Sequence, residues 1–412
     1  MTRLYLGLTL PGAGLPGDTS VPMPGLLECR GDELRMGSNG LYLRAGDLRP
    51  TAWWTEAGMQ PLPDLPPLEF RGLNAGQRQQ SRQFFDALEA AVPSLKEHRG
   101  LGSTGRWMPT IAATASETAP SMFACFHLVQ LGEPGAMYVH YHDESVPLAS
   151  TRPGLCELLQ ALNDGNSRHG QRLDALRPAL GDECWYTKWR PDVEMERKFT
   201  FRGIPDTWSL LHTLHREITR SSASGFVPEL DREIQVWDYE QHIFEVLGAN
   251  SESGYIAYIP QADGHMTVKR KWFIENSEIR RESLWVDHQL QLCDIDAHVR
   301  TLTAEHTRRL PGYRRKRFDA QFESLHTGNI FGIYMDICRT LDGRDSFTQC
   351  EIEYCRTRTF GDIRLVEQDF NHFSTYVAAQ FERLGVAFQQ DLYSKLDFVR
   401  SIADSPAARE AA

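Results

Sequence analysis

The chain has 412 residues, 41% of them hydrophobic and 24% charged, a composition typical of a folded globular protein rather than a disordered one. This length exceeds the usual size of one hydrophobic core, so two domains are expected. The formal net charge of −11 argues against a general nucleic-acid-binding protein, and no stretch approaches the roughly 18 apolar residues of a membrane span.

The cysteines and the first residues of the chain indicate in which cellular compartment the protein is expected. The 8 cysteines are scattered without a CxxC pair, which favours reduced thiols in a cytoplasmic protein over a disulfide framework or a zinc site. The apolar run Leu4–Leu10 is short, soon meets Pro11 and Gly12, and has no clear cleavage signature. It therefore predicts a first β-strand rather than a signal peptide.

Residues 1–185 are expected to form a smaller α+β domain of unknown role. Their sequence is rich in Gly and Pro, with short apolar runs between turn signals. An amphipathic pattern predicts a helix over residues 77–95, and two further helical patterns follow. The predicted strands are Leu4–Leu10, Gly40–Arg44, Phe123–Leu131 and Met137–Tyr141, and the further helices span 153–163 and 171–180.

Three motifs in this half carry weaker signals. His140 and His142 share one face of a strand and could ligate a metal, but no third ligand can be chosen, which favours a structural or exposed role. The pair Trp53 and Trp54 favours core or interface packing over a ligand platform. The glycine-rich stretch 100–105 does not end in Gly-Lys-Ser/Thr and so predicts a plain loop rather than a phosphate loop.

Residues 186–404 have a different pattern of predicted elements, with many strands of alternating hydrophobicity, one early helix and late helices. This order predicts an α+β domain built on a closed or nearly closed antiparallel sheet. The predicted strands are 193–201, 233–239, 243–246, 255–259, 266–273, 282–286, 313–322, 330–338 and 347–356, and the predicted helices are 205–220, 367–384 and 392–402.

The first of these strands carries an unusual charge pattern. Successive side chains of a strand point to opposite faces, so Glu194, Glu196 and Lys198 share one face. Two neighbouring carboxylates repel each other unless a cation neutralises them. For a lone pair of this kind, a solvated surface strand is the simpler interpretation.

The same chemistry recurs on later strands. A second carboxylate pair occurs in one strand, a single carboxylate lies mid-strand among apolar residues, and basic residues alternate on two further strands. Carboxylate oxygens suit Mg²⁺ or Mn²⁺, whereas ammonium and guanidinium groups suit phosphate oxygens. These residues are Glu351 and Glu353, Asp336, Lys269 and Lys271, and Arg315 and Arg317.

Together these motifs resemble those of the CYTH, or triphosphate tunnel metalloenzyme, family. Glu194, Glu196 and Lys198 match its opening ExExK motif. The elements that follow match in order: Thr267 with Lys269, Arg280 with Glu282, Arg315 with Arg317, Asp336, Glu351 with Glu353, and finally Ser394 with Lys395. The resemblance covers roughly half the chain and implies an antiparallel β-tunnel with flanking helices.

The resemblance implies a divalent-metal-dependent enzyme acting on a phosphorylated small molecule, most simply a triphosphate or nucleoside triphosphate phosphohydrolase. Glu194, Glu196, Glu351, Glu353 and Asp336 would hold Mg²⁺ or Mn²⁺. The catalytic set would be Glu194, Glu196, Lys198 and Asp336. The phosphates would be bound by Lys198, Lys269, Lys271, Arg315, Arg317 and Lys395.

One strand departs from the family pattern. The family usually has an LRxR-like strand that supplies two arginines, but the matching segment here, Tyr255–Tyr258, has no basic residue. Its tyrosines could instead pack against an aromatic portion of the substrate. Two alternatives therefore stay open: a nucleotidyl cyclase of the class IV type, and a non-catalytic module that binds a phosphate ligand.

Overall fold

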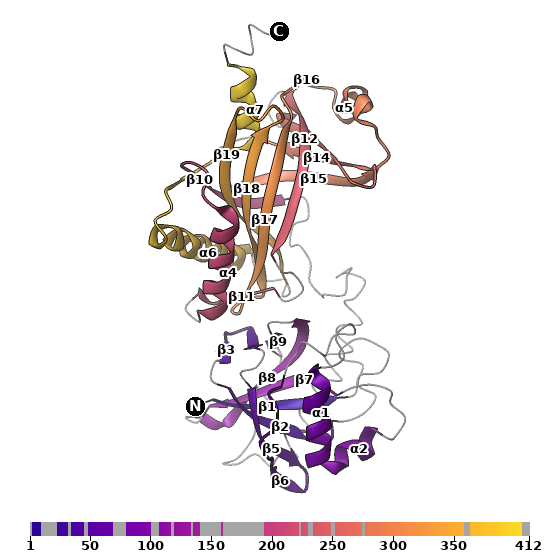
Figure 1. Cartoon of the computed structure of the whole chain (residues 1–412), viewed down its shortest axis with the longest axis vertical. Helices are drawn as coiled ribbons and strands as arrows, with labels where there is room; N and C mark the ends of the chain where they lie inside the picture. Colours follow the sequence, from indigo (N-terminus) through magenta and orange to yellow (C-terminus); the bar gives the residue numbers. More distant parts are fainter. Residues whose placement is uncertain are drawn as a thin grey trace. The chain divides into compact units, whose positions relative to one another are not determined.

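The fold is taken from a computed structural model (Figure 1). It describes residues 2–9, 23–31, 34–44, 48–68, 80–99, 107–116, 119–132, 135–140, 158–159, 193–221, 224–229, 234–248, 252–273, 277–357 and 363–405. The chain divides into two compact units. Unit 1 comprises Met1–Thr187, Ser324–Gly328 and Thr357–Phe360, and unit 2 comprises Lys188–Glu323, Asn329–Arg356 and Gly361–Ala412.

Several sequence-based expectations lie outside the described residues. They are the boundary near residue 185, the loop 100–105, His142 and almost all of the predicted helices 153–163 and 171–180. They stay predictions.

Unit 1 is built on one antiparallel sheet. Within the described residues the order of its strands is β3-β4-β9-β8-β7-β1-β2-β5-β6, and every neighbouring pair is antiparallel. The α+β prediction is confirmed for this unit. The strands are β1 (Thr2–Thr9), β2 (Leu26–Gly31), β3 (Leu34–Met36), β4 (Gly40–Arg44), β5 (Leu48–Thr55), β6 (Gly58–Pro61), β7 (Met108–Ser116), β8 (Ala119–Gly132) and β9 (Gly135–His140).

The helix expected over residues 77–95 is two helices, α1 (Gln80–Ala91) and α2 (Pro93–Arg99). Pro93 explains the break, because proline disfavours helical geometry at the preceding residue and suits the first position of a new helix. Phe84 and Leu88 of α1 are buried in the core cluster of the sheet. Trp53 belongs to the same cluster and is buried, as the packing interpretation predicted.

Unit 2 contains a ring of strands. Among the described residues, neighbours pair in the order β17-β18-β19-β10-β15-β14-β13-β12, and β12 pairs in turn with β17, which closes the cycle. The strand pairing confirms the prediction of a closed or nearly closed antiparallel sheet. The ring strands are β10 (Val193–Phe201), β12 (Gln235–Leu247), β13 (Gly254–Pro260), β14 (Met266–Trp272), β15 (Ile279–His288), β17 (Tyr313–Ser324), β18 (Asn329–Thr340) and β19 (Ser346–Thr357).

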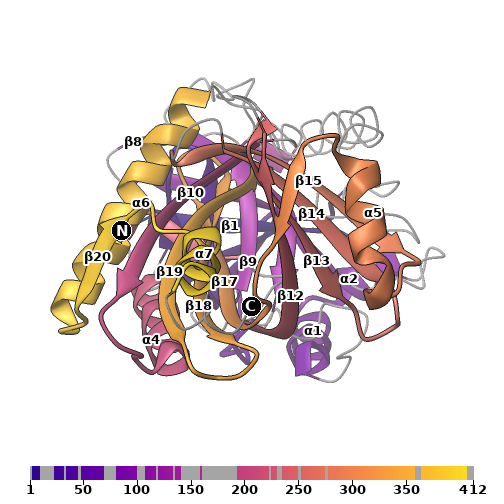
Figure 2. The ribbon, with the colours of Figure 1, turned by 90° about the horizontal axis from the view of Figure 1, so that it is seen from above.

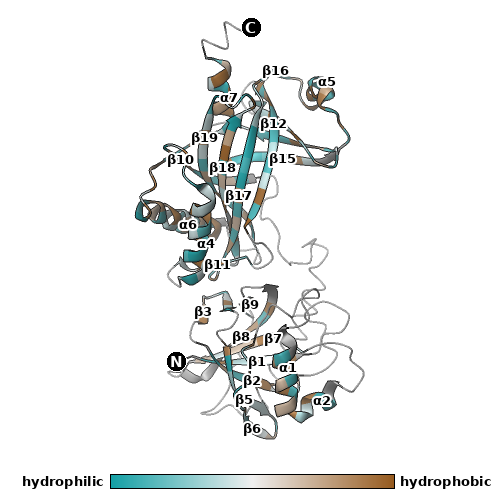
Figure 3. Ribbon diagram, viewed as in Figure 1, coloured by the Kyte–Doolittle hydropathy of each residue, from teal (hydrophilic) through white to brown (hydrophobic). Residues whose placement is uncertain are grey.

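Two helices pack on the outside of this ring, α4 (Thr207–Arg220) and α6 (Ile363–Arg383) (Figure 1). Their apolar residues, such as Leu211 and Phe373, share a core cluster with Phe199 of β10 and Ile352 of β19. Because Phe199 and Ile352 alternate with charged neighbours, the helices cover the apolar face of these strands and leave the charged face for the interior. Hydrophilic stretches run along β12 and β17 (Figure 3).

Helix α7 (Lys395–Ala403) lies across one end of the ring (Figure 2). Its residues Leu396 and Val399 are buried in a cluster with Tyr255 and Ala257 of β13 and Tyr313 of β17. The helix begins at a capping box in which the side chains and backbone of Ser394 and Asp397 bond reciprocally. This cap fixes where the helix starts and therefore where Lys395 enters the ring.

Some elements differ from the sequence-based expectations. The segments 233–239 and 243–246 form one strand, β12, because Gln235–Gln241 pairs with β17 and His242–Val246 pairs with β13. Four elements of unit 2 were not predicted, namely β11 (Phe226–Pro228), α5 (Ile295–Leu302), β16 (His306–Arg309) and β20 (Phe388–Asp391). In unit 1 the strands β2, β3, β5, β6 and β7 were not predicted. None of the helices in the described part of the chain is both long and apolar enough to cross a membrane.

Candidate functional site

The charged residues of β10 lie on the inner face of the ring. Lys271 of β14 approaches Glu196 of β10, with Nζ 3.7 Å from Oε2, although β15 separates these two strands in the sheet. Such a contact between non-adjacent strands requires both side chains to point into the ring. Lys198 pairs in register with Glu351 of β19, so Glu351 shares this face.

Glu196 is surrounded by cations. Its Oε1 accepts a hydrogen bond from Arg280 Nη1 at 2.6 Å and also contacts Lys198 Nζ. Both Glu196 and Arg280 are almost completely buried. Removal of either partner would leave a buried charge without compensation, a situation that costs several kcal/mol.

Glu194 and Glu282 share two lysines. Lys271 contacts Glu194 and lies 3.5 Å from Glu282, whereas Lys269 lies 2.7 Å from Glu282 and 4.0 Å from Glu194. Burial raises the pKa of Glu282, but Lys269 and Lys271 outweigh burial and lower that pKa to about 2. The Glu282 carboxylate is therefore ionised at neutral pH.

Asp336, fully buried in β18, is held by three cations. Arg317 donates from Nε and Nη2 to its two oxygens at 2.8 and 2.9 Å, Lys395 Nζ lies 3.0 Å from Oδ2, and Arg315 contacts the same oxygen. An unpaired carboxylate would be costly at this depth. The sequence signal was therefore correct in singling out Asp336 as a residue that needs partners.

Glu351 contacts the same three cations. Arg317 Nη2 donates at 2.7 Å and Arg315 Nη2 at 3.1 Å to Oε2, and Lys395 contacts Oε1. Burial raises the pKa of Glu351, but Lys395 and Arg315 outweigh it and hold that pKa well below its usual range. Lys395 also donates to Gln349 Oε1 at 3.1 Å.

We call the residues joined by these ion pairs the inner-face cluster. It contains seven cations and five carboxylates, so the cations are in local excess among these ion-paired residues. Glu353, opposite Glu196 in register, and the buried Asp319, two residues from Arg317 on β17, place two further carboxylates on the inner face of the ring. Excess positive charge in a poorly solvated interior favours an anion. The cluster comprises Lys198, Lys269, Lys271, Arg280, Arg315, Arg317 and Lys395, with Glu194, Glu196, Glu282, Asp336 and Glu351.

Lysines of the cluster differ in their proton affinity. Burial lowers the pKa of Lys198 despite the nearby carboxylates of Glu196 and Glu351. Burial also acts on Lys395, but Asp336 and Glu351 outweigh it and raise that pKa. Lys198 is thus the lysine that most needs an additional negative charge in order to stay protonated.

The structure brings the predicted site residues together on the inner face of the ring. The side chain of Glu353 is half-buried and shares this face through its register with Glu196. Arg280 and Glu282, matched only to a family motif in the sequence, belong to the cluster. Sequence reasoning missed Tyr239 of β12. Burial raises the pKa of its phenol, and the positive charge of Arg315 acts in the opposite direction.

The chemistry of the donors partly fits a divalent cation. In the described residues, no three His, Cys, Asp or Glu side chains are grouped so as to hold one metal ion. Mg²⁺, however, usually binds one or two carboxylates together with substrate phosphates and water. Glu194 and Glu196 match that pattern by residue type, although Lys271 contacts Glu194 Oε2 and three cations, Lys198, Lys271 and Arg280, surround Glu196. Asp336 and Glu351 are each surrounded by three cations as well, so a divalent cation at any of these carboxylates would compete with Lys or Arg side chains.

The strand without basic residues, β13, has a different role. Tyr255 and Ala257 lie on its inner face and are buried in the same apolar cluster as Leu396 and Val399 of α7, so they help to position this helix. Tyr258 faces the other side, where its hydroxyl lies 3.1 Å from His298 Nδ1. Tyr258 is therefore not placed to pack against a substrate in the ring, whereas for Tyr255, in register with Lys271, that expectation stays a prediction.

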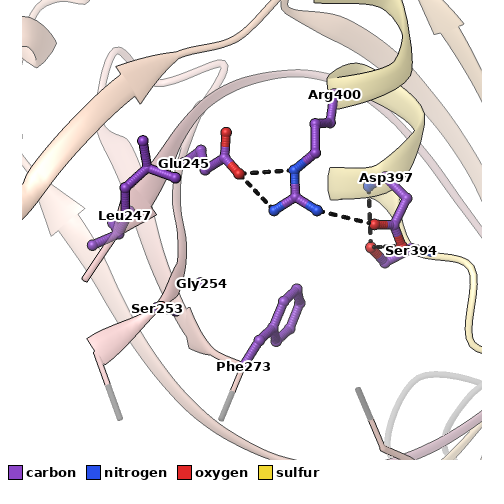
Figure 4. Close-up of a pocket in the computed structure, with 9 residues that line it drawn as sticks. Glu245, Leu247, Ser253, Gly254, Phe273, Ser394, Asp397 and Arg400 are labelled. Atoms are coloured by element: carbon purple, nitrogen blue, oxygen red, sulfur yellow. Dashed lines mark hydrogen bonds and ion pairs between the residues drawn. The ribbon is translucent and has the colours of Figure 1, made fainter. Parts of the chain in front are cut away.

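A pocket of about 280 Å³ lies at the end of the ring beside α7 (Figure 4). Arg400 of α7 reaches into it and donates from Nε to Glu245 Oε1 at 2.8 Å, while its Nη1 lies 3.3 Å from Asp397. Phe273 forms another part of the wall. These contacts anchor α7 to β12 and so help to hold Lys395 in the cluster.

Comparison with known proteins gives little further guidance. No protein-family model matches the chain, and no curated protein matches it. Among solved structures, the chain is similar to the RNA triphosphatase Pct1 of S. pombe, with 11% sequence identity over 47% of this chain and 81% of that chain. The TM-score is 0.19, which does not establish a shared fold.

Proposed function

We propose that unit 2 is a CYTH-type tunnel that binds a triphosphate compound and hydrolyses it with the help of Mg²⁺ or Mn²⁺. The observation that carries this proposal is the excess of cations over carboxylates in the inner-face cluster. A buried excess of Lys and Arg needs negative charge from a ligand, and a polyphosphate supplies several charges in a short chain.

Arg315, Arg317 and Lys395 would bind one part of the phosphate chain. Arg317 donates two hydrogen bonds to the two carboxylate oxygens of Asp336. The same planar arrangement of donors suits two oxygens of a phosphate. Lys198 and Lys269 would bind the other part from β10 and β14. Asp336 and Glu351 position the three cations between them.

Glu194 and Glu196 are the residues that would hold the cation when it enters with the substrate. The cation would supply charge neutralisation of the phosphate oxygens and a more acidic water. Phosphoryl transfer depends mostly on position and electrostatics, which preorganised side chains provide. Lys198, whose pKa burial lowers, would gain the most from the negative charge that develops in the transition state.

A second candidate function is a binding module without turnover. Two observations favour it: β13 contributes no cation, and no three metal-capable side chains converge among the described residues. In that case the cluster would retain polyphosphate affinity, but its carboxylates would serve only to hold the cations.

The decisive experiment is a screen of inorganic and organic polyphosphates with Mg²⁺ or Mn²⁺, in which released products are resolved. Orthophosphate that disappears on chelation of the metal supports hydrolysis, whereas pyrophosphate with a cyclic nucleotide supports cyclisation. Tight binding without any product supports the binding module. Absence of both binding and turnover with every polyphosphate would overturn the proposal.

A further inference from the structure

One large aromatic side chain on the inner face of the ring is half-exposed. Trp237 of β12 pairs in register with Arg317 of β17, and residues opposite each other in an antiparallel pair point to the same face. Arg317 points inward, as its bonds to Asp336 and Glu351 show. Trp237 is nevertheless 52% exposed.

The surroundings of Trp237 combine charge with aromatic surface. The guanidinium of Arg317 lies 4.3 Å from the centre of the Tyr334 ring, and it also reaches the carboxylates of the inner-face cluster. Tyr239, two residues from Trp237 on the same strand face, is half-buried. Arg317 therefore lies between the cations proposed to bind phosphate and the solvent-accessible aromatic side chains around Trp237.

Solvent exposure marks the side from which a ligand enters. The side chain of Arg317 is 15% exposed and that of Lys269 is 21% exposed, whereas Lys395 is 7% exposed at the end covered by α7. Two other inner-face aromatics, Tyr255 and Tyr313, are closed off, because they are buried in a cluster with α7. Trp237 thus lies on the accessible side of the cluster.

We infer that the triphosphate is carried on a planar aromatic group, such as a nucleobase, which stacks on Trp237 while its phosphates extend past Arg317 into the cluster. The inference rests on the proposed function and specifies its substrate class. Stacking suits any base, because every base presents a π-face, and loss of one stacking side chain weakens binding about tenfold or more.

The test compares two probes, ATP and inorganic tripolyphosphate, on the full-length protein by calorimetry and steady-state kinetics. Trp237→Ala should raise the Kd and KM for ATP about tenfold and those for tripolyphosphate less than twofold, and Trp237→Phe should restore most of the affinity for ATP. The matched control is Trp285→Ala, because Trp285 is a 39% exposed tryptophan in register with Val268, which packs in a separate core cluster.

The outcomes separate this inference from the proposed function. If tripolyphosphate and ATP bind equally well and Trp237→Ala changes neither, the stacking site is excluded and the phosphate site stands. If Trp237→Ala weakens both probes alike, Trp237 supports the phosphate site instead of an aromatic group, and the inference is also overturned. If neither probe binds the wild-type protein, the proposed function fails together with the inference.

Discussion

Lys395, the first residue of α7, lies with Nζ 3.0 Å from Oδ2 of Asp336, a fully buried carboxylate on β18. The contact joins the last helix of the chain to the interior of the ring. It depends on the cap formed by Ser394 and Asp397, because that cap sets the residue at which the helix begins. Helix α7 thus closes one end of the ring and also supplies a cation to the cluster.

Lys395→Met is expected to weaken tripolyphosphate binding about tenfold or more, because a charge-assisted hydrogen bond contributes roughly 1.5–3 kcal/mol. Calorimetry on the purified protein would measure the change. The matched control is Lys316→Met, since Lys316 is an exposed lysine on β17 whose side chain lies 5.7 Å from the Phe318 ring, on the opposite face from Arg315 and Arg317. An equal loss in both variants would show a general charge effect and would contradict a specific role for Lys395.

Arg400→Ala should loosen α7, because two nitrogens of Arg400 hold the carboxylate of Glu245 on β12. Nε donates to Oε1 at 2.8 Å, and Nη2 lies 2.6 Å from the same oxygen. We expect a loss of about 1–3 kcal/mol in the free energy of unfolding and faster hydrogen exchange in the backbone amides of α7. Arg383→Ala is the control, because Arg383 forms an exposed pair with Glu217 at 3.2 Å. Unchanged exchange in α7 would show that the apolar cluster alone holds the helix.

Glu196→Gln should destabilise the metal-free protein by about 3–5 kcal/mol, because it leaves the buried cations Lys198 and Arg280 without their counter-charge. Tripolyphosphate added in the presence of a chelator should then raise Tm more in this variant than in the wild type, since the ligand replaces the missing charge. Glu240→Gln, at an exposed carboxylate, is the control. A smaller ligand-induced rise in Glu196→Gln would indicate that Glu196 does not restrain these cations.

Acid should destabilise the fold through Glu282. The folded-state pKa of Glu282 is lowered to about 2 from an ordinary value of 4.5, so its ionised form stabilises the native state above about pH 4.5. That contribution, at most about 3 kcal/mol, is lost as the pH falls from 4.5 toward 2. Denaturant unfolding at several pH values would measure it. Glu282→Gln should flatten the dependence in this range, and an unchanged slope would contradict the assignment.

The charged strands could be predicted from the sequence because alternation decides which side chains share a face. Glu194, Glu196 and Lys198 fall on one face in any regular strand, and β10 has the predicted limits. The same rule grouped Arg315 with Arg317 on β17. What it could not provide was the partner of each charge, because the pairing of β10 with both β15 and β19 is decided by long-range register.

Aromatic residues were harder to assign. Tyr255 and Trp237 look alike in the sequence, since each lies in a strand with alternating pattern, but α7 covers Tyr255 and leaves Trp237 half-exposed. The position of α7 depends on packing between residues about 140 apart in the chain, which local periodicity does not encode. The division of residues 77–95 into two helices, by contrast, was signalled by Pro93.

The most direct test of the central claim is a calorimetric titration of tripolyphosphate into the metal-free protein and into Arg315→Gln. Arg315 contacts both Asp336 and Glu351 near the middle of the inner-face cluster. The excess of cations predicts one binding site in the wild type, with affinity that falls as salt is added and that drops at least tenfold in Arg315→Gln. Absence of binding in the wild type, or equal affinity in the folded variant, would contradict the account.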